Sequence, residues 1–210
     1  MKNLNYIDIK KVVEGTFAFG TIQNYDEIYP AVEFLSKQNI TNFLEIGTNQ
    51  GGTFYCWTCI SNLGIRISVD IPHGDFSAHE FDEIKRNKIL SGYPGYCHFI
   101  SGDSHEKSTL TEVETLLNGE KLDFIFIDGD HTEEGVTKDF LMYRDLVKDG
   151  GWIGFHDIKN SYFHHSHNCF VDKLWERLSG DKFEFIDHSN GFGGIGLIQN
   201  NSNLEYNNKI

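Results

Sequence analysis

One stretch of the chain, residues 42–53, constrains the fold more than any other. It begins with the short run Phe43-Leu44-Glu45-Ile46 and continues with glycines at positions 47, 51 and 52. The run predicts a strand, the glycines predict a tight turn, and the residues from Thr53 onward predict a helix. In such a unit the backbone can approach a ligand closely, and the start of the helix offers unpaired N–H groups and a positive dipole end.

The spacing of the glycines separates several kinds of ligand-binding loop. A dinucleotide-binding loop has the pattern G-x-G-x-x-G, but Asn49 occupies the place of its middle glycine, and no Lys-Ser/Thr pair follows as in a P-loop. The pattern Glu45-x-Gly47-x-x-x-Gly51 resembles the first motif of class I S-adenosylmethionine-dependent methyltransferases. This resemblance implies that Gly47, Thr48 and Gly51 wrap the methionine part of the cofactor and that Glu45 contacts its cationic end. An ordinary tight turn is the alternative interpretation.

Charge and length restrict the partners. The 210 residues suit one domain with a full core, and the net charge is −13. Such a charge argues against binding to nucleic-acid phosphates or to anionic membranes, so we expect neither partner. The N-terminus has no apolar signal core, no apolar run reaches membrane-spanning length, and four cysteines do not suggest a disulfide framework. We therefore expect a cytoplasmic protein with a small-molecule partner, and we leave a homo-oligomer open.

Strand patterns alternate with helix patterns along most of the chain, which predicts a parallel α/β sheet covered on both faces. The expected strands are 43–47, 66–71, 98–100, 122–128, 152–155, 183–186 and 195–198, and the expected helices are 28–35, 53–63, 76–90, 106–117, 133–147 and 171–178. The connection between the last two strands, residues 187–194, is too short for a helical crossover, so the last strand should be antiparallel.

The chain shows no repeat and no low-complexity linker, so we expect a single domain over residues 1–210. Residues 1–25 should form a peripheral N-terminal segment. Residues 158–170 are the candidate lid over a substrate, because they carry Tyr162 and Phe163 beside several histidines. The tail, residues 200–210, is expected to be frayed.

Acids recur where the predicted strands end, at Glu45, Asp70, Asp103, Asp128 and Asp157. In open α/β sheets, ligands bind outside the carboxyl ends of the strands. Asp70 lies about twenty residues beyond the glycine loop, where an acid can bind ribose hydroxyls. By the same resemblance, Asp103 and Ser104 fall where the family holds the adenine end of the cofactor. Each acid alone could equally cap a loop or be solvated, but their common register favours a binding edge.

Two central motifs are more specific. Residues 126–136 read Phe-Ile-Asp-Gly-Asp-His-Thr-Glu-Glu-Gly-Val, and residues 150–158 read Gly-Gly-Trp-Ile-Gly-Phe-His-Asp-Ile. Together they resemble a group of small-molecule O-methyltransferases of the macrocin, rhamnosyl and cephalosporin-cluster type. Gly20-x-x-Gln23-x-x-Asp26 resembles the entry motif of that group. The resemblance covers residues 20–198 and implies a Rossmann-like sheet of seven strands, mostly parallel, with helices on both faces and an antiparallel last strand.

The same resemblance implies a site for a divalent metal. In several relatives, a metal lies between an acid at the fourth strand end and an acidic pair at the fifth, which correspond to Asp128 and to His156-Asp157. Carboxylates suit Mg²⁺, whereas the imidazole of His156 favours a softer ion such as Mn²⁺. His131 is the candidate general base, since its ordinary pKa lies near neutrality. Alternatively, His131 only orders its loop, and the acids bind cofactor without a metal.

Two further patterns carry weaker hypotheses. Cys56-Trp57-Thr58-Cys59 has C-x-x-C spacing, but it lies inside a predicted helix and away from the helix N-terminus, so buried thiols are the favoured interpretation. Residues 164–169, His-His-Ser-His-Asn-Cys, could bind zinc, belong to the lid or form a plain surface loop.

From these observations we predict an S-adenosylmethionine-dependent O-methyltransferase that acts on a hydroxyl of a small molecule, such as a sugar or polyol, with a metal that assists. Its predicted catalytic residues are Asp128 and His131, its metal ligands Asp128, His156 and Asp157, and its cofactor residues Glu45, Gly47, Thr48, Gly51, Asp70, Asp103, Ser104 and Asp128. A nicotinamide-dependent oxidoreductase on a related fold and a non-catalytic cofactor-binding module are the alternatives.

Overall fold

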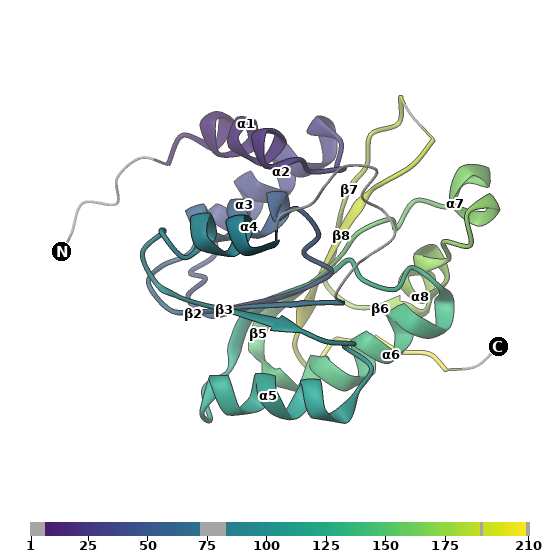
Figure 1. Ribbon diagram of the computed structural model, residues 1–210. Helices are drawn as coiled ribbons and strands as arrows, with labels where there is room; N and C mark the ends of the chain where they lie inside the picture. The colour runs from purple at the N-terminus through teal and green to yellow at the C-terminus, as the bar shows by residue number, and fades with distance from the viewer. Residues whose placement is uncertain (1–6, 72–82, 190, 209–210) are drawn as a thin grey trace.

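A sheet of seven strands forms the centre of the computed structural model, which describes residues 7–71, 83–189 and 191–208. The strand order is β3-β2-β1-β4-β5-β8-β7 (Figure 1). β8 is antiparallel to both of its neighbours, and the pairs from β3 to β5 are parallel. The predicted fold class is therefore confirmed, including the antiparallel last strand. The strands are β1 (Phe43–Ile46), β2 (Ile65–Asp70), β3 (Tyr96–Ser101), β4 (Leu122–Ile127), β5 (Val147–Phe155), β7 (Lys182–Phe185) and β8 (Ile195–Asn200).

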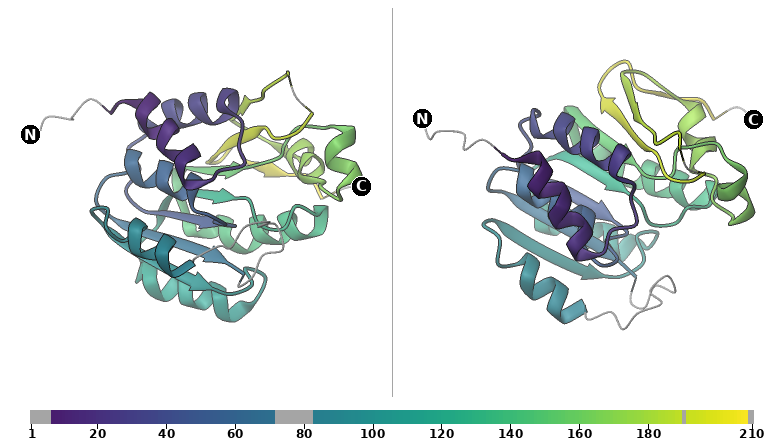
Figure 2. Two further views of the ribbon diagram at one scale, coloured as in Figure 1. Left: turned by 45° about the horizontal axis from the view of Figure 1, so that its top comes forward. Right: turned by 90° about the horizontal axis from the view of Figure 1, so that it is seen from above.

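Helices cover both faces of the sheet and enclose two apolar cores (Figures 1 and 2). Alternation along β1 sends Phe43 into one core and Leu44 into the other. The face of Phe43 carries α1 (Ile9–Phe19), α2 (Tyr25–Ser36), α3 (Gly52–Ile60) and α4 (Glu83–Leu90). The face of Leu44 carries α5 (Lys107–Leu117), α6 (Glu133–Tyr143) and α8 (Val171–Arg177).

The described parts of the two terminal segments pack against the rest of the protein. Within the segment predicted to be peripheral, α1 buries Val12, Val13 and Thr16 in the core shared with α2 and α3. Within the tail predicted to be frayed, β9 (Glu205–Tyr206) pairs with β6 (Leu178–Ser179), and Leu204 is buried. The apolar face of α1 and the side chain of Leu204 supply the burial that holds these segments in place.

Some predicted boundaries also differ. The helix predicted over 133–147 ends at Tyr143, and a short 3₁₀ turn, Arg144–Leu146, leads directly into β5. β5 therefore begins at Val147 rather than at 152, and it includes the two glycines that were expected to stop the helix. Of the helix predicted over 76–90, residues 76–82 lie outside the described residues, and α4 accounts for the rest.

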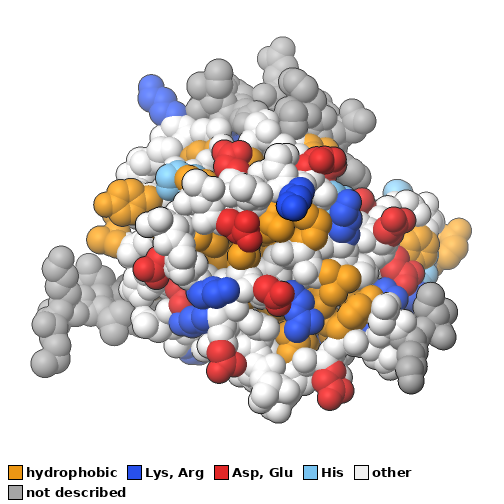
Figure 3. All heavy atoms as spheres, turned by 90° about the horizontal axis from the view of Figure 1, so that it is seen from below, with side chains coloured by type: hydrophobic (Ala, Val, Ile, Leu, Met, Phe, Trp, Pro, Cys, Tyr) orange, Lys and Arg blue, Asp and Glu red, His pale blue; other side chains and the backbone are white. Residues whose placement is uncertain are grey.

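The surface was expected to repel nucleic acid and anionic membranes. On the face that carries α5, Lys and Arg side chains are interspersed with Asp and Glu side chains (Figure 3). Among the helices that the structure describes, none is both long and apolar enough to cross a membrane. The absence of nucleic-acid and membrane partners stays a prediction.

Gly47 follows β1 directly, and a glycine is required there because this loop packs closely against the loop after β4. Its φ is 84°, a left-handed value that favours glycine, and a Cβ added there would lie 2.0 Å from the backbone oxygen of Asp128. The backbone after β1 therefore packs against the backbone after β4. Gly47 brings the two strand ends together, which is a structural role in addition to any contact with a ligand.

We predict that Gly47→Ala destabilises the protein far more than Gly119→Ala. Gly119 has nearly the same φ, 87°, but an added Cβ would meet nothing within 4 Å. Gly119→Ala should therefore lower the unfolding free energy by about 1–2 kcal/mol, the cost of a left-handed conformation for alanine. Gly47→Ala has the same cost and a backbone clash in addition. Chemical denaturation of both variants measures the difference, and equal losses of stability would contradict this role for Gly47.

Candidate functional site

A cavity of about 1040 Å³ opens at the carboxyl ends of β1, β2, β4 and β5. Most of the predicted site residues line it, which confirms that the sheet brings them together. The structure places Gly47, Thr48, Asp70, Asp103, Ser104, Asp128, His131, His156 and Asp157 on its wall. Glu45 and Gly51 are the two predicted site residues that do not line it.

Glu45 lies beneath the cavity wall and not on it. Its side chain is fully buried on the α3 face of the sheet, where one carboxylate oxygen accepts a hydrogen bond from the Thr53 hydroxyl at 2.8 Å. Burial raises the pKa of Glu45 well above its ordinary value, although the Thr53 hydrogen bond opposes the rise. Alternation along β1 points the Glu45 side chain at α3, and its contact with a cofactor stays a prediction.

Gly51 has a structural role at the start of α3. It is the N-cap residue of α3 with a φ of 90°, and its α-carbon faces the side chains of Leu90 and Arg86. The glycine that remains at the cavity is Gly47, followed by Thr48 and Asn49. Asn49 has a φ of 45°, so the loop turns through a left-handed residue next to the cavity.

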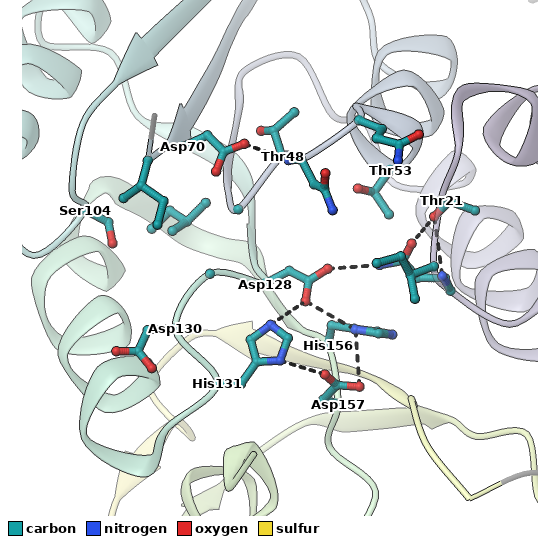
Figure 4. A pocket seen from close by; sticks show the side chains of 18 of the residues that line it. Thr21, Thr48, Thr53, Asp70, Ser104, Asp128, Asp130, His131, His156 and Asp157 are labelled. Atoms are coloured by element: carbon teal, nitrogen blue, oxygen red, sulfur yellow. Dashed lines mark hydrogen bonds and ion pairs between the residues drawn. The ribbon is translucent and has the colours of Figure 1, made fainter. Parts of the chain in front are cut away.

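Asp70, at the end of β2, fixes the glycine loop and stays accessible. Its Oδ2 atom accepts a hydrogen bond from the Asn49 backbone N–H at 2.7 Å and lies 3.4 Å from the Arg86 guanidinium. Its side chain is 22% exposed, which leaves it able to accept a hydrogen bond from a ligand. Ser104 and Asp103, after β3, line the neighbouring part of the cavity. In Figure 4, Asp70 and Ser104 lie on one side of Asp128, and His131, His156 and Asp157 lie on the other.

The ends of β4 and β5 bring two carboxylates and two imidazoles together (Figure 4). Asp128 Oδ1 lies 3.3 Å from His131 Nε2 and 3.2 Å from His156 Nδ1. Asp157 lies 3.0 Å from His131 Nδ1 and 3.4 Å from His156 Nδ1. The φ of Asp157 is 61°, an uncommon value for a residue with a side chain. Each imidazole therefore stands between the same two acids, and we call these four residues the Asp-His cluster.

Electrostatics inside the Asp-His cluster favour charged histidines. Burial acts to lower the pKa of His131, but its contacts with Asp128 and Asp157 outweigh burial and raise the pKa. The same balance raises the pKa of buried His156 well above its ordinary value. Burial acts to raise the pKa of Asp157, but the charge of His156 outweighs it and holds the pKa well below the ordinary range. The two carboxylates thus favour the protonated form of both imidazoles.

The Asp-His cluster also offers a set of metal ligands. Asp128, His156 and Asp157 each supply one ligand atom, and these atoms all lie within 4.8 Å of one another. Two carboxylate oxygens and one imidazole nitrogen are suitable donors for Mn²⁺ or Mg²⁺. The residues present therefore fit the divalent ion that the sequence predicted.

Helix α2 and the segment before it contribute two side chains that the sequence analysis missed as site residues. Gln23 donates a hydrogen bond to Asp128 Oδ2 at 2.9 Å, and the fully buried Glu27 lies 3.1 Å from His156 Nε2. Glu27 also accepts a hydrogen bond from the Asn24 backbone at 2.8 Å in a capping box. The Gly20-x-x-Gln23 motif was the only sequence signal for Gln23, and no sequence pattern marked Glu27 as a site residue.

The candidate lid does contribute to the cavity. It contains α7 (Tyr162–Ser166), and Phe163, His164, His167 and Cys169 all line the cavity wall. His164 is buried, and its Nε2 lies 3.2 Å from Asp157 Oδ1 and accepts a hydrogen bond from the Gly193 N–H at 2.9 Å. This residue therefore joins α7 to the end of β5 and to the loop before β8. Movement of the lid stays a prediction.

The C-x-x-C pair has no reactive environment in the structure. Cys56 is fully buried in α3, and burial raises its pKa strongly. Burial likewise raises the pKa of Cys59. Both cysteines are free thiols that are held in the protonated form, as expected for packing residues.

A second acid–histidine pair lies at the part of the cavity near Ser104. His105 Nε2 donates a hydrogen bond to the Gly135 carbonyl at 3.1 Å and lies 3.4 Å from a carboxylate oxygen of Asp139, which is fully buried in α6. The Asp139 carboxylate raises the pKa of His105, and burial only partly opposes it. The pair thus links α6 to the cavity wall.

A comparison with protein-family models agrees with this geometry. Residues 44–158 match a family described as a methyltransferase domain. That range runs from β1 to the residue after the Asp-His cluster. A relative, the uncharacterised protein R132 of Acanthamoeba polyphaga mimivirus, is 28% identical over 167 residues, which are 79% of this chain and 71% of the relative.

Solved structures share the fold. The MycE methyltransferase from the mycinamycin biosynthetic pathway, in complex with Mg, SAH and mycinamycin VI, superposes with a TM-score of 0.57 at 15% identity and over 91% of this chain. This chain spans about half of MycE, 54% of its length. The O-methyltransferase from Bacillus cereus, in complex with SAH, gives a TM-score of 0.56 at 16% identity and covers 91% of this chain and 90% of its own. At these identities the likeness shows the fold alone.

We predict that the His105–Asp139 pair stabilises the protein most in mild acid. Because the pKa of His105 is raised in the folded state, its contribution is fully present below about pH 6.5, the ordinary histidine value, and is lost as the pH rises through the raised pKa. The stability difference between wild type and Asp139→Asn should therefore shrink from pH 5.5 to pH 9, taken as an approximate window.

Two measurements check this prediction. Urea denaturation across the window gives the stability difference, and NMR titration of the His105 ring should show a lower midpoint in Asp139→Asn than in wild type. An unchanged midpoint would contradict the effect of Asp139 on the pKa of His105.

Proposed function

Because the chain belongs to the methyltransferase-domain family, we propose that it is an S-adenosylmethionine-dependent O-methyltransferase acting on a hydroxyl of a small molecule. One observation carries this proposal. A single cavity holds the glycine loop and Asp70 on one side and the Asp-His cluster on the other. A cofactor and an acceptor bound on these two sides would meet at Asp128, which is the arrangement that a group-transfer reaction requires.

The cofactor side of the cavity fits S-adenosylmethionine by its donors and acceptors. We assign the methionine part to the backbone of Gly47, Thr48 and Asn49, and the ribose hydroxyls to the accessible carboxylate of Asp70. The adenine end would lie at Asp103 and Ser104, beside His105. The cofactor supplies an electrophilic methyl group on a sulfonium centre. The match to SAH-bound O-methyltransferases supports this assignment at the level of the fold.

The residues of the Asp-His cluster supply orientation and a proton acceptor. S-adenosylmethionine would supply the methyl group to the acceptor oxygen, and His131 would accept the proton that the acceptor hydroxyl loses. Gln23 orients Asp128, and Glu27 orients His156, through the hydrogen-bond contacts described above. Exclusion of water by Phe163 and the candidate lid would protect the reacting groups.

We propose further that Asp128, His156 and Asp157 hold a divalent ion, Mg²⁺ or Mn²⁺. Two observations support this proposal. The ligand atoms of the three residues lie close together, and MycE, which has the same fold, was solved with Mg. With the carboxylate charge shared by a cation, His131 no longer needs to remain protonated and becomes available as the base. An ion at this place favours an acceptor with adjacent oxygens, such as a sugar or another polyol.

We predict that SAH binds and that Asp70→Asn weakens its binding about tenfold, because a charge-assisted hydrogen bond to the ribose is lost. Asp145→Asn is the control, since the Asp145 side chain is 91% exposed and lies at the opposite edge of the sheet, before β5. Isothermal titration calorimetry measures both. Binding of NAD in place of SAH would contradict the cofactor and favour an oxidoreductase.

We predict that Asp157→Asn lowers turnover by about 100-fold while SAH binding stays nearly unchanged, because only the acceptor loses its position. Asparagine tolerates the left-handed backbone of this position, so the variant should keep the fold. Asp130→Asn is the control, because Asp130 lines the cavity but accepts its hydrogen bond from the Thr132 backbone at 2.9 Å.

Chelation tests the ion separately. EDTA should abolish methyl transfer by the wild type, and added Mg²⁺ or Mn²⁺ should restore it. Full methyl transfer in EDTA, together with normal activity of Asp157→Asn, would rule out the metal.

A further inference from the structure

Cys169 is a cavity residue for which the proposed reaction has no use. It follows α7, it is 5% exposed, and it lines the cavity wall beside the Asp-His cluster. Its neighbours are His131 and Asp157, and one ligand atom of each of these three residues lies within 4.8 Å of the others. A thiol, an imidazole and a carboxylate therefore meet at one point of the wall.

The backbone holds the thiol in this place. The Cys169 N–H donates to the His164 carbonyl at 2.9 Å, and the next N–H, that of Phe170, donates to the His131 carbonyl at 2.8 Å. The preceding Asn168 adopts a left-handed φ of 58°, which turns the chain toward the cavity. The loop after β4 and the segment after α7 are thus tied together beside the three ligand atoms, so the set is preorganised.

The chemistry of these donors differs from that of the proposed Mg²⁺ or Mn²⁺ ligands. Thiolate and imidazole are the donors that Zn²⁺ prefers, and three protein ligands with one open position are a usual arrangement for a zinc site at a cavity. Asp128 adds a further feature, because it lies 3.3 Å from the far nitrogen of His131, Nε2. A carboxylate on that nitrogen fixes the tautomer in which Nδ1, the atom 3.0 Å from Asp157, is the metal ligand.

We propose that His131, Asp157 and Cys169 form a binding site for Zn²⁺ or a similarly soft divalent ion. Binding of the ion releases two protons to solvent, one from the Cys169 thiol and one from Nδ1 of the protonated His131 imidazole, and the thiolate and the freed Nδ1 lone pair bind the ion. The site shares Asp157 with the Asp128–His156–Asp157 set, so the two ions compete for that carboxylate. If the proposed function holds, occupancy also inhibits methyl transfer, because the base can no longer accept a proton.

Co²⁺ is the probe for this site, because a thiolate ligand gives it a charge-transfer absorption band that nitrogen and oxygen ligands do not give. Metal-free protein in a phosphine reductant is titrated with Co²⁺, and the band should appear at one equivalent and disappear when Zn²⁺ is added. Cys169→Ser should abolish the band. Cys97→Ser is the matched control, because the Cys97 thiol lies on β3 and donates to the Leu90 carbonyl, and this variant should keep the band.

Competition calorimetry gives the affinity for Zn²⁺. Loss of the thiolate should weaken binding by about tenfold or more, since removal of an outer partner of a ligand already costs about that much. Cys169→Ala serves as a second variant, and circular dichroism verifies that each variant is folded. A folded wild type without the band, or a band that persists in both Cys169 variants, overturns the proposal.

An activity assay separates this proposal from the proposed function. In the presence of Mg²⁺, one equivalent of Zn²⁺ should inhibit methyl transfer by the wild type, and each Cys169 variant, compared with its own zinc-free rate, should be less sensitive. A thiolate band without any methyl transfer would overturn the proposed function and leave the zinc site standing. Methyl transfer without the band would overturn the zinc site and leave the proposed function standing.

Discussion

The approach of two carboxylates at the ends of β4 and β5 is the constraint on which the rest of the site depends. The two strands pair in parallel with Ile127 opposite Phe155, so Asp128, directly after β4, and Asp157, two residues after β5, leave the same edge of the sheet. Such carboxylates repel each other unless positive charge or a shared proton lies between them. In this chain His131 and His156 stand between them, each in contact with both acids. The imidazoles thus separate the two acids, and the cluster keeps the donors that an ion would use.

Distant parts of the chain converge on this cluster at one edge of the sheet. Two buried imidazoles and two acids need neighbours that fix their hydrogen bonds, and helix α2 supplies Glu27 to His156 while Gln23 contacts Asp128. His164 from α7 approaches Asp157 from the other side. Consequently the N-terminal helices and the candidate lid are parts of the site, and Gly47 brings the loop after β1 against Asp128.

Much of the architecture could be predicted because it depends on local sequence patterns. Apolar runs that end in acids marked the strands, and the short connection before β8 indicated its direction. The hydrogen bond between Glu45 and Thr53 could not be read from the motif, because it depends on how β1 packs against α3. Glu27 could not be assigned to the site, because its role depends on contact with His156, far away in the sequence. Cys169 was part of the candidate lid, but its closeness to His131 and Asp157 could not be predicted for the same reason. The pairing of β9 with β6 has the same cause, as neither segment has a strand pattern of its own.

The central claim is that cofactor and divalent ion bind side by side in one cavity, with Asp128 between them. A crystal structure of the protein with SAH and Mn²⁺, recorded with anomalous scattering, tests it most directly. The account predicts an anomalous peak within coordination distance of Asp128 and Asp157 and SAH density along Gly47–Asn49 and Asp70. SAH bound elsewhere, or saturating Mn²⁺ without a peak between the two carboxylates, would contradict it.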